Sequence, residues 1–386
     1  MSTRRALLIS GAYFPPQIGG ISRQLHRIAT QLGPAEVSVL TGARANGDTN
    51  SHHLRIRRVP SLFYASKFVR AASWIKTLTT ILATERPDLV LLGSVDDANL
   101  GLWLHDVMKF PVVLFAYGNE MLSTIEGPHE QPKRAFKVAN QVIVCSQYSG
   151  SLAIQAGTNE KRVSVLYPGC DSDVFRPFAV SSEFRERILA TSSADTKVVL
   201  SVGNLVSRKG HDVVIRALKE LRLKVPQLLY LIIGDGPGRE TLAQLSREVG
   251  VADIVRFIGT IPDAELPHYY NLCDVFVMAS RAQVDQSDVE GFGIVFLEAN
   301  SCNKPVVGGR SGGVSEAVHE GVSGLLADPH SPNDVADVLG KILTNDEFAR
   351  ELGTQGRARV IRDFSWSGYG ESLLTILNAA RMEGPL

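Results

Sequence analysis

The sequence has no apolar run of about 18 residues, so no segment is expected to span a membrane. The apolar run near its start, ALLIS, is too short for the core of a signal peptide. Four cysteines (Cys145, Cys170, Cys273 and Cys302) lie far apart, without a CxxC pair or a metal-ligand spacing with histidine, which is typical of reduced structural thiols. We therefore expect a cytoplasmic protein without a transmembrane helix.

An excess of charge of either sign is also missing. Basic and acidic residues number 40 each, so the composition favours no nucleic acid partner. The nine histidines are scattered, apart from the adjacent His52 and His53, and no DxD motif follows a predicted strand. We therefore expect no metal site and no bound cofactor.

What the chain does contain is two series of short apolar runs rich in Val, Ile and Leu, with helical segments between them. The runs cover residues 6–10, 37–40, 88–93, 112–116 and 142–146, and then 198–203, 228–234, 255–259, 274–280 and 304–309. This alternation predicts an α/β fold in which parallel sheets are covered by helices on both faces. The length of 386 residues suits two such domains.

Proline and glycine interrupt the chain between the two series, at Pro168, Gly169 and Pro177. We accordingly expect two Rossmann-like, doubly wound domains, over residues 1–175 and 176–365. The remaining residues, 366–386, are expected to form a C-terminal helix that could cross back to the first domain.

A glycine pair follows the first predicted strand. The motif FPPQIGGI places Gly19 and Gly20 before a helix whose apolar residues share one face. A strand, a glycine loop and a helix N-terminus can form an anion cradle, because residues without a Cβ let backbone N–H groups approach a phosphate. The same pattern is equally typical of a tight strand-to-helix turn.

Basic residues follow the first strand of the second series. In SVGNLVSRKGHD, Arg208 and Lys209 lie at the strand edge where ligands of open α/β sheets bind, and two cations there would neutralise a diphosphate. A solvated basic loop is the alternative. The next strand ends in LIIGDGPG, where Gly234 begins a loop with little side-chain bulk, suited to a nucleobase or ribose, or simply to a tight turn.

The segment DVEGFGIVFLEA has the densest pattern of candidate residues. Glu290 precedes the turn GFG, and the residues after it predict a helix with Glu298 little more than one turn inside it. The helix N-terminus favours a phosphate, Glu298 can accept hydrogen bonds from ribose, and Glu290 can reach sugar hydroxyls. Acids that merely complement the helix dipole are the alternative, but they leave the flanking glycines unexplained. Further donor contacts are assigned to Phe292, Gly293, Ile294 and Val295.

Together these motifs resemble those of the family 4 glycosyltransferases of GT-B fold, which are retaining enzymes that use nucleotide-diphosphate sugars. The resemblance covers nearly the whole chain and rests on FPPQIGGI, LVSRKG, LIIGDGPG, RFIGTIPDAELPHYYNLCDVFVMAS, SGGVSEAV, GVSGLLADP and the E-x7-E pair Glu290 and Glu298. The stretch RAQVDQSDVEGFGIVFLEA is most similar to mannosyltransferases acting on phosphatidylinositol mannosides and to enzymes of bacterial polysaccharide and glycolipid assembly. This implies transfer of a hexose from GDP-mannose or a UDP-hexose to a glycolipid, a polyprenyl-linked glycan or a small-molecule acceptor.

Roles follow from the resemblance at the matching positions. It implies that Lys209, with the Gly19–Gly20 pair, holds the diphosphate. It also implies that Glu290 contacts the donor sugar, Glu298 the ribose and the backbone around Ile261 the base. Catalysis would be retaining and metal-free, with front-face attack and closure of the two domains over the substrates.

Two positions depart from the family pattern. Asn204 stands where an arginine is usual, which leaves less positive charge for the leaving diphosphate, and Arg208 would compensate. Tyr117, in YGNE, stands where many members have histidine. A phenol can hydrogen-bond a sugar hydroxyl or the acceptor but is no cation near neutral pH. Tyr117 therefore joins Glu290, Lys209 and Arg208 as a catalytic candidate.

A candidate membrane-contact segment lies in the first domain. Residues 55–82 contain six basic side chains, four aromatic ones and no acid. This stretch could rest on the anionic inner face of a membrane, or be an ordinary helix that packs its aromatic residues on the sheet.

Two functional alternatives also remain: a GT-B-fold sugar-nucleotide epimerase or phosphorylase, and a non-catalytic nucleotide-sugar-binding protein. The sequence sets neither the donor, the acceptor nor the oligomeric state.

Overall fold

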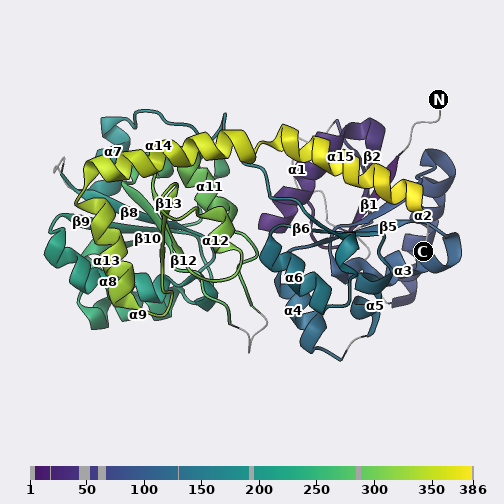
Figure 1. Cartoon of the computed structure of the whole chain (residues 1–386), viewed down its shortest axis with the longest axis horizontal. Helices are drawn as coiled ribbons and strands as arrows, with labels where there is room; N and C mark the ends of the chain where they lie inside the picture. Colours follow the sequence, from purple (N-terminus) through teal and green to yellow (C-terminus); the bar gives the residue numbers. More distant parts are fainter. Residues whose placement is uncertain are drawn as a thin grey trace. The chain divides into compact units, whose positions relative to one another are not determined.

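The computed structural model describes residues 5–17, 19–42, 53–59, 67–128, 130–190, 195–283 and 288–384, with backbone only for 67–74. The chain forms two compact units, Met1–Pro168 with Trp366–Leu386, and Gly169–Ser365 (Figure 1). The first division falls earlier than residue 175, because the segment after Pro168 hydrogen-bonds within the second unit. The Cys170 N–H donates to the Phe364 carbonyl at 2.7 Å, for example.

The first unit contains a seven-stranded parallel sheet in the order β3-β2-β1-β4-β5-β6-β7. Its strands are β1 (Ala6–Ser10), β2 (Val37–Thr41), β3 (Arg55–Arg58), β4 (Leu89–Leu92), β5 (Val112–Ala116), β6 (Gln141–Val144) and β7 (Val163–Val165). Its α-helices are α1 (Gly20–Glu36), α2 (Lys67–Glu85), α3 (Ala98–Met108), α4 (Asn119–Glu126), α5 (Glu130–Val138), α6 (Gln147–Gln155) and α15 (Trp366–Glu383).

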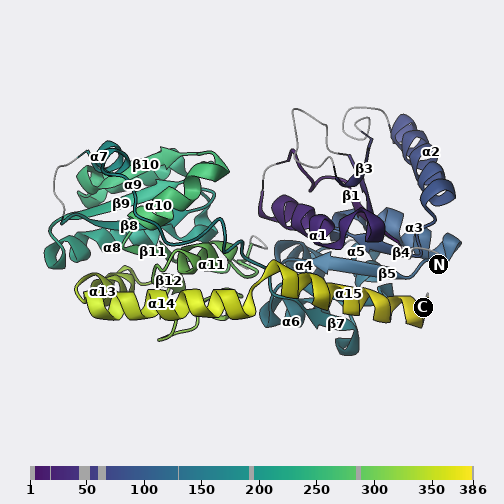
Figure 2. The same cartoon turned by 90° about the horizontal axis from the view of Figure 1, so that it is seen from above.

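Helices α1 and α15 cover one face of this sheet. Leu25 and Ile28 of α1, and Leu373 and Leu377 of α15, belong to one buried cluster with alternate residues of the central strands. The two helices lie side by side (Figures 1 and 2). Arg381 Nε also donates to Asp88 Oδ1 at 3.0 Å. The C-terminal helix is thus an integral layer of the first unit.

The second unit contains a six-stranded sheet in the order β10-β9-β8-β11-β12-β13, again parallel throughout. Its strands are β8 (Lys197–Val202), β9 (Leu228–Ile233), β10 (Val255–Gly259), β11 (Val275–Met278), β12 (Val306–Gly309) and β13 (Gly324–Ala327). Its α-helices are α7 (Ser182–Leu189), α8 (His211–Lys224), α9 (Arg239–Val249), α10 (Leu266–Leu272), α11 (Ile294–Ser301), α12 (Val314–Ala317), α13 (Pro332–Leu343) and α14 (Asp346–Asp363).

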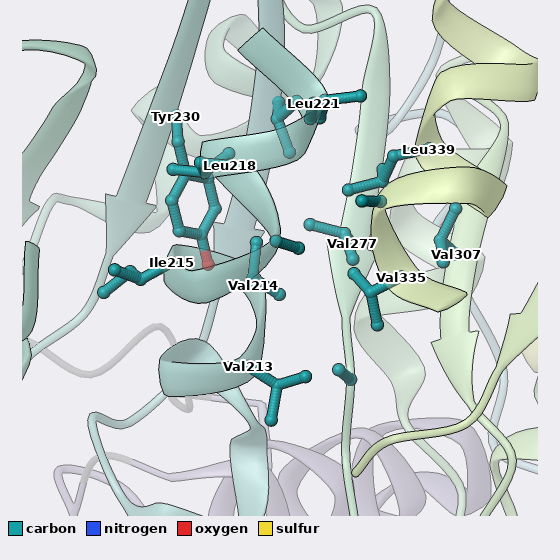
Figure 3. Packing of buried hydrophobic residues seen from close by; sticks show 14 of the residues in the cluster. Val213, Val214, Ile215, Leu218, Leu221, Tyr230, Val277, Val307, Val335 and Leu339 are labelled. Atoms are coloured by element: carbon teal, nitrogen blue, oxygen red, sulfur yellow. The ribbon is translucent and has the colours of Figure 1, made fainter. Parts of the chain in front are cut away.

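Strand β11 shows how this sheet is buried on both faces. Val277 points into the aliphatic cluster formed with α8 and α13, in which Val214 and Leu339 take part (Figure 3). Phe276 points to the other face, where its ring packs 5.5 Å from that of Phe296 in α11. Because successive side chains alternate between faces, a strand covered on both sides consists of apolar residues alone. The predicted α/β class with two Rossmann-like sheets is confirmed.

The basic, aromatic stretch 55–82 is not one continuous helix. Arg55–Arg58 form the edge strand β3, and helix α2 begins at Lys67. An edge strand is exposed on one side, so the sequence RIRR contains no apolar run. Phe63 and Tyr64 of the basic, aromatic stretch lie outside the described residues. No helix of the described part of the chain is long and apolar enough to cross a bilayer.

Candidate functional site

The strand order of the second unit puts two loops next to each other. Along the chain, the sheet grows from β8 to β9 and β10 on one side, and then restarts with β11 on the other side of β8. Ligands of open α/β sheets bind at such a switch point, outside the carboxyl ends of the strands. The loop after β8 carries Arg208 and Lys209, and the loop after β11 carries Glu290.

These three predicted residues meet at the switch point. Lys209 Nζ lies 2.5 Å from Glu290 Oε2, and Arg208 Nη1 lies 2.7 Å from the same oxygen. Their side chains are only 12%, 18% and 13% exposed for Lys209, Arg208 and Glu290. The second carboxylate oxygen, Oε1, accepts no hydrogen bond from any residue in the described ranges. Two cations and one carboxylate with a spare oxygen are therefore held in a partly enclosed place.

Burial and charge act in opposite directions on these groups. Burial alone would raise the pKa of Glu290, but the Lys209 ammonium and the Arg208 guanidinium outweigh it, and the pKa is lowered. Burial lowers the pKa of Lys209, an effect that the nearby Glu290 carboxylate opposes and the Arg208 charge adds to. Glu290 is therefore ionised near neutral pH, while Lys209 gives up its proton more readily than an exposed lysine.

Sequence analysis missed a fourth member of this cluster, Asp288. Its Oδ1 lies 2.7 Å from Arg208 Nε, and its side chain is 23% exposed. The signal was present in the motif DVE, which places a second acid two residues before Glu290. It could not be interpreted from the sequence, because the pairing with Arg208 depends on loops that follow different strands.

Helix α11 places the predicted ribose-binding residue. Glu298 is 7% exposed, and its Oε2 accepts a hydrogen bond from the Tyr270 hydroxyl at 2.7 Å. Tyr270 was not predicted, and it fixes one carboxylate oxygen inside the unit. The Phe292 side chain is buried against the ring of Phe364, so only its backbone can serve the assigned donor contact. Ile294 and Val295 begin the helix after Gly293, whose φ of 96° favours glycine.

The predicted glycines differ in whether the surrounding structure leaves room for a side chain. A Cβ on Gly234 would lie 2.0 Å from the Gly203 carbonyl oxygen, so close packing of two loops requires glycine there. A Cβ on Gly19 or Gly20 would meet no described atom within 4 Å. Packing therefore requires glycine at position 234, and a φ of 158° favours glycine at position 19. Neither reason applies to Gly20.

The other predicted donor contacts lie on the same edge of the sheet, in less defined surroundings. Asn204 is exposed directly after β8, and Ile261 is half-buried after β10, two strands away. Neither side chain is brought into the ion cluster by a recorded contact. Both roles remain predictions.

Tyr117 lies in the first unit, at the equivalent edge of its own sheet. The Glu120 carboxylate accepts hydrogen bonds from the backbone N–H groups of Tyr117 and Gly118, the latter at 3.2 Å. The Tyr117 hydroxyl is buried without a hydrogen-bond partner in the described part of the chain, and burial raises its pKa well above the usual value. Tyr117 therefore stays a neutral phenol near neutral pH, as the sequence implied.

Asp97 lies near the switch point between β1 and β4 of the first unit. Its Oδ1 accepts a hydrogen bond from the Gly11 N–H at 3.0 Å, and burial raises its pKa to about 7.

In the described ranges, no three His, Cys, Asp or Glu side chains are grouped so as to hold a metal ion. Independence from metals remains a prediction.

Comparison with known proteins gives a consistent result. The chain matches the models "Glycosyltransferase Family 4" over residues 18–174 and "Glycosyl transferases group 1" over residues 184–359. A GDP-mannose-dependent alpha-(1-6)-phosphatidylinositol monomannoside mannosyltransferase of Mycobacterium tuberculosis is 37% identical over 393 residues, covering 97% of this chain and 98% of the relative. The enzyme of the same description from Mycolicibacterium smegmatis is 37% identical over 244 residues, which is 63% of each chain.

Solved structures agree on the fold. HepE of Anabaena, solved in complex with UDP and glucose, superposes with a TM-score of 0.80 at 22% identity, over 97% of this chain and 99% of that one. The motif order, the paired parallel sheets and the full-length similarity together show that the chain belongs to the family 4 glycosyltransferases of GT-B fold.

Proposed function

We propose that the protein is a retaining hexosyltransferase that moves mannose from GDP-mannose to a phosphatidylinositol mannoside-like glycolipid. The observation that carries the transfer chemistry is the meeting of Lys209, Arg208 and Glu290 at the switch point of the second unit. The printed descriptions of the 37% identical relatives support the choice of donor and acceptor. The alternative donors are UDP-hexoses. The alternative acceptors are polyprenyl-linked glycans and small molecules.

In this proposal the cations hold the leaving diphosphate. Negative charge builds on the diphosphate as the bond to the sugar breaks, so fixed positive charge beside it lowers the barrier. Lys209 and Arg208 use one donor each on Glu290, and Arg208 also uses Nε on Asp288. Their remaining N–H groups can reach phosphate oxygens. The N-terminus of α11 adds backbone N–H groups and the positive end of the helix dipole.

Glu290 and Glu298 then orient the donor. Glu290 Oε2 is occupied by the two cations, and its Oε1 can accept a hydrogen bond from a hydroxyl of the sugar. Glu298, whose Oε2 accepts a hydrogen bond from Tyr270, is proposed to bind the ribose. In the first unit, we place the acceptor hydroxyl near Tyr117, whose buried hydroxyl lacks a partner among the described residues.

Incubation of the pure protein with a panel of nucleotide sugars tests this proposal. A transferase releases the free nucleoside diphosphate when acceptor is present, whereas an epimerase returns an isomerised donor, and a non-catalytic binder shows a thermal shift without turnover. NMR of the product linkage reports retention or inversion. Activity that is undiminished in excess EDTA would support metal-free transfer.

A further inference from the structure

The loop that carries Glu290 is fastened to the loop that carries the cations. The Arg281 N–H donates to the Arg208 carbonyl at 2.8 Å, and the Arg281 guanidinium lies 3.1 Å from the Asp212 carboxylate. Gln283 Nε2 donates to Ser207 Oγ at 2.7 Å. These contacts fix the two backbones, so the side chains of Arg208 and Asp288 face each other in a defined geometry.

The ion cluster at the switch point of the second unit contains equal numbers of positive and negative side chains. Arg208 and Lys209 contribute two positive charges, and Asp288 and Glu290 contribute two negative ones, with side chains between 12% and 23% exposed. Glu290 serves both cations through one oxygen, whereas Asp288 contacts only Arg208 among these cations, through Nε. Asp288 therefore neutralises Arg208 without occupying the end of the guanidinium that can reach a phosphate.

We propose that Asp288 is a positioning residue that orients Arg208 beside Glu290 and, by balancing its charge, limits how tightly the nucleoside diphosphate product is held. This inference rests on the proposed function, because it requires the diphosphate to bind at Arg208 and Lys209. The cations must stabilise the negative charge that develops on the leaving diphosphate in the transition state. The released nucleoside diphosphate carries the same negative charge, so the cations also bind this product. A fixed carboxylate beside Arg208 repels that product and so favours its release, a step that limits the turnover of many enzymes.

Two substitutions separate the effect of charge from that of position. Asp288→Asn removes the charge but keeps an oxygen that can accept a hydrogen bond from Arg208 Nε. Asp288→Ala removes both. We expect Asp288→Asn to lower the Kd for GDP, or for UDP if that is the donor base, by about three- to tenfold, because one repulsive charge near the diphosphate is lost. The inhibition constant of the same product should fall in parallel.

The position of Arg208 is tested by the alanine variant. We expect Asp288→Ala to have a lower kcat than Asp288→Asn, by about tenfold or more, because Arg208 loses its second anchor. Thermal unfolding of both variants shows whether the unit remains folded. An equal kcat in the two variants would remove the positioning role.

Two further variants make the outcome decisive. Asp253→Asn breaks an exposed ion pair with Arg222 in the same unit and should leave diphosphate affinity unchanged. Lys209→Met should weaken diphosphate binding. If Lys209→Met binds weakly but Asp288→Asn binds no more tightly than the native protein, the inference about Asp288 is wrong. If Lys209→Met binds as tightly as the native protein, the proposed diphosphate site itself is wrong.

Discussion

Replacement of Glu290 with glutamine isolates the charge on which the transfer chemistry depends. The side chain keeps its shape, but Lys209 and Arg208 lose the carboxylate oxygen that they share at 2.5 and 2.7 Å. A hydrogen bond to a charged group contributes about 1.5–3 kcal/mol, and part of it survives with an amide. We expect the unfolding free energy of the second unit to fall by about 1–3 kcal/mol.

The effect on catalysis should be larger than the effect on binding. If Glu290 aligns the donor sugar in the transition state, kcat should fall about 100- to 1000-fold, which corresponds to about 3–4 kcal/mol. The Kd of the nucleoside diphosphate should stay the same or fall, because a negative charge beside the phosphates has been removed. Single-turnover transfer and isothermal titration calorimetry measure the two quantities.

The control is Glu320→Gln, which breaks an exposed ion pair with Arg310 at 3.0 Å in the same unit and should alter neither quantity. Two results would refute the reasoning about Glu290→Gln. Unchanged kcat would show that Glu290 does not act on the sugar, and a Kd raised more than tenfold with unchanged kcat would make it a simple binding residue.

Three further predictions concern the loops, the pH dependence and the membrane. Gly234→Ala should destabilise the second unit by about 2–4 kcal/mol in chemical denaturation, since its Cβ would lie 2.0 Å from a carbonyl oxygen; Gly20→Ala, with open space around it, should leave stability unchanged and reduce transfer if the cradle binds substrate. The affinity for the diphosphate should fall as pH rises, and the fall should begin below the usual pKa of lysine. Burial lowers the pKa of Lys209, and only the ammonium form of Lys209 attracts phosphate. Calorimetry at about pH 7 to 10 measures this pH dependence, which Lys209→Met should abolish. The protein should cosediment with anionic liposomes at low salt through residues 55–82, and equal binding to neutral vesicles would contradict this.

The central strands were predictable because they are buried on both faces. The interior strands β1 and β5 coincide with predicted apolar runs, and the other interior strands differ by one or two residues at an end. The edge strand β10 was also predicted, because its sequence VRFIG is largely apolar. The three strands that sequence analysis missed, β3, β7 and β13, all lie at an edge of their sheet. An edge strand is short and partly exposed, so it lacks the continuous apolar run that marks an interior strand.

The site was predictable where local motifs mark it and unpredictable where distant residues pair. Glu290 and Lys209 stand in recognisable motifs on either side of the switch point. Asp288 and Tyr270 also lie within quoted motifs, but their roles depend on Arg208 and Glu298, which the fold brings to them from 80 and 28 positions away along the sequence. Local composition carries no information about such pairs.

The position of a bound nucleoside diphosphate tests the whole account most directly. In a crystal structure with GDP, the account predicts phosphate oxygens within hydrogen-bond distance of Lys209 Nζ and the Arg208 guanidinium, beside the first residues of α11 and with the ribose toward Glu298. A diphosphate bound elsewhere in the second unit, away from Lys209 and from residues 288–298, would contradict it.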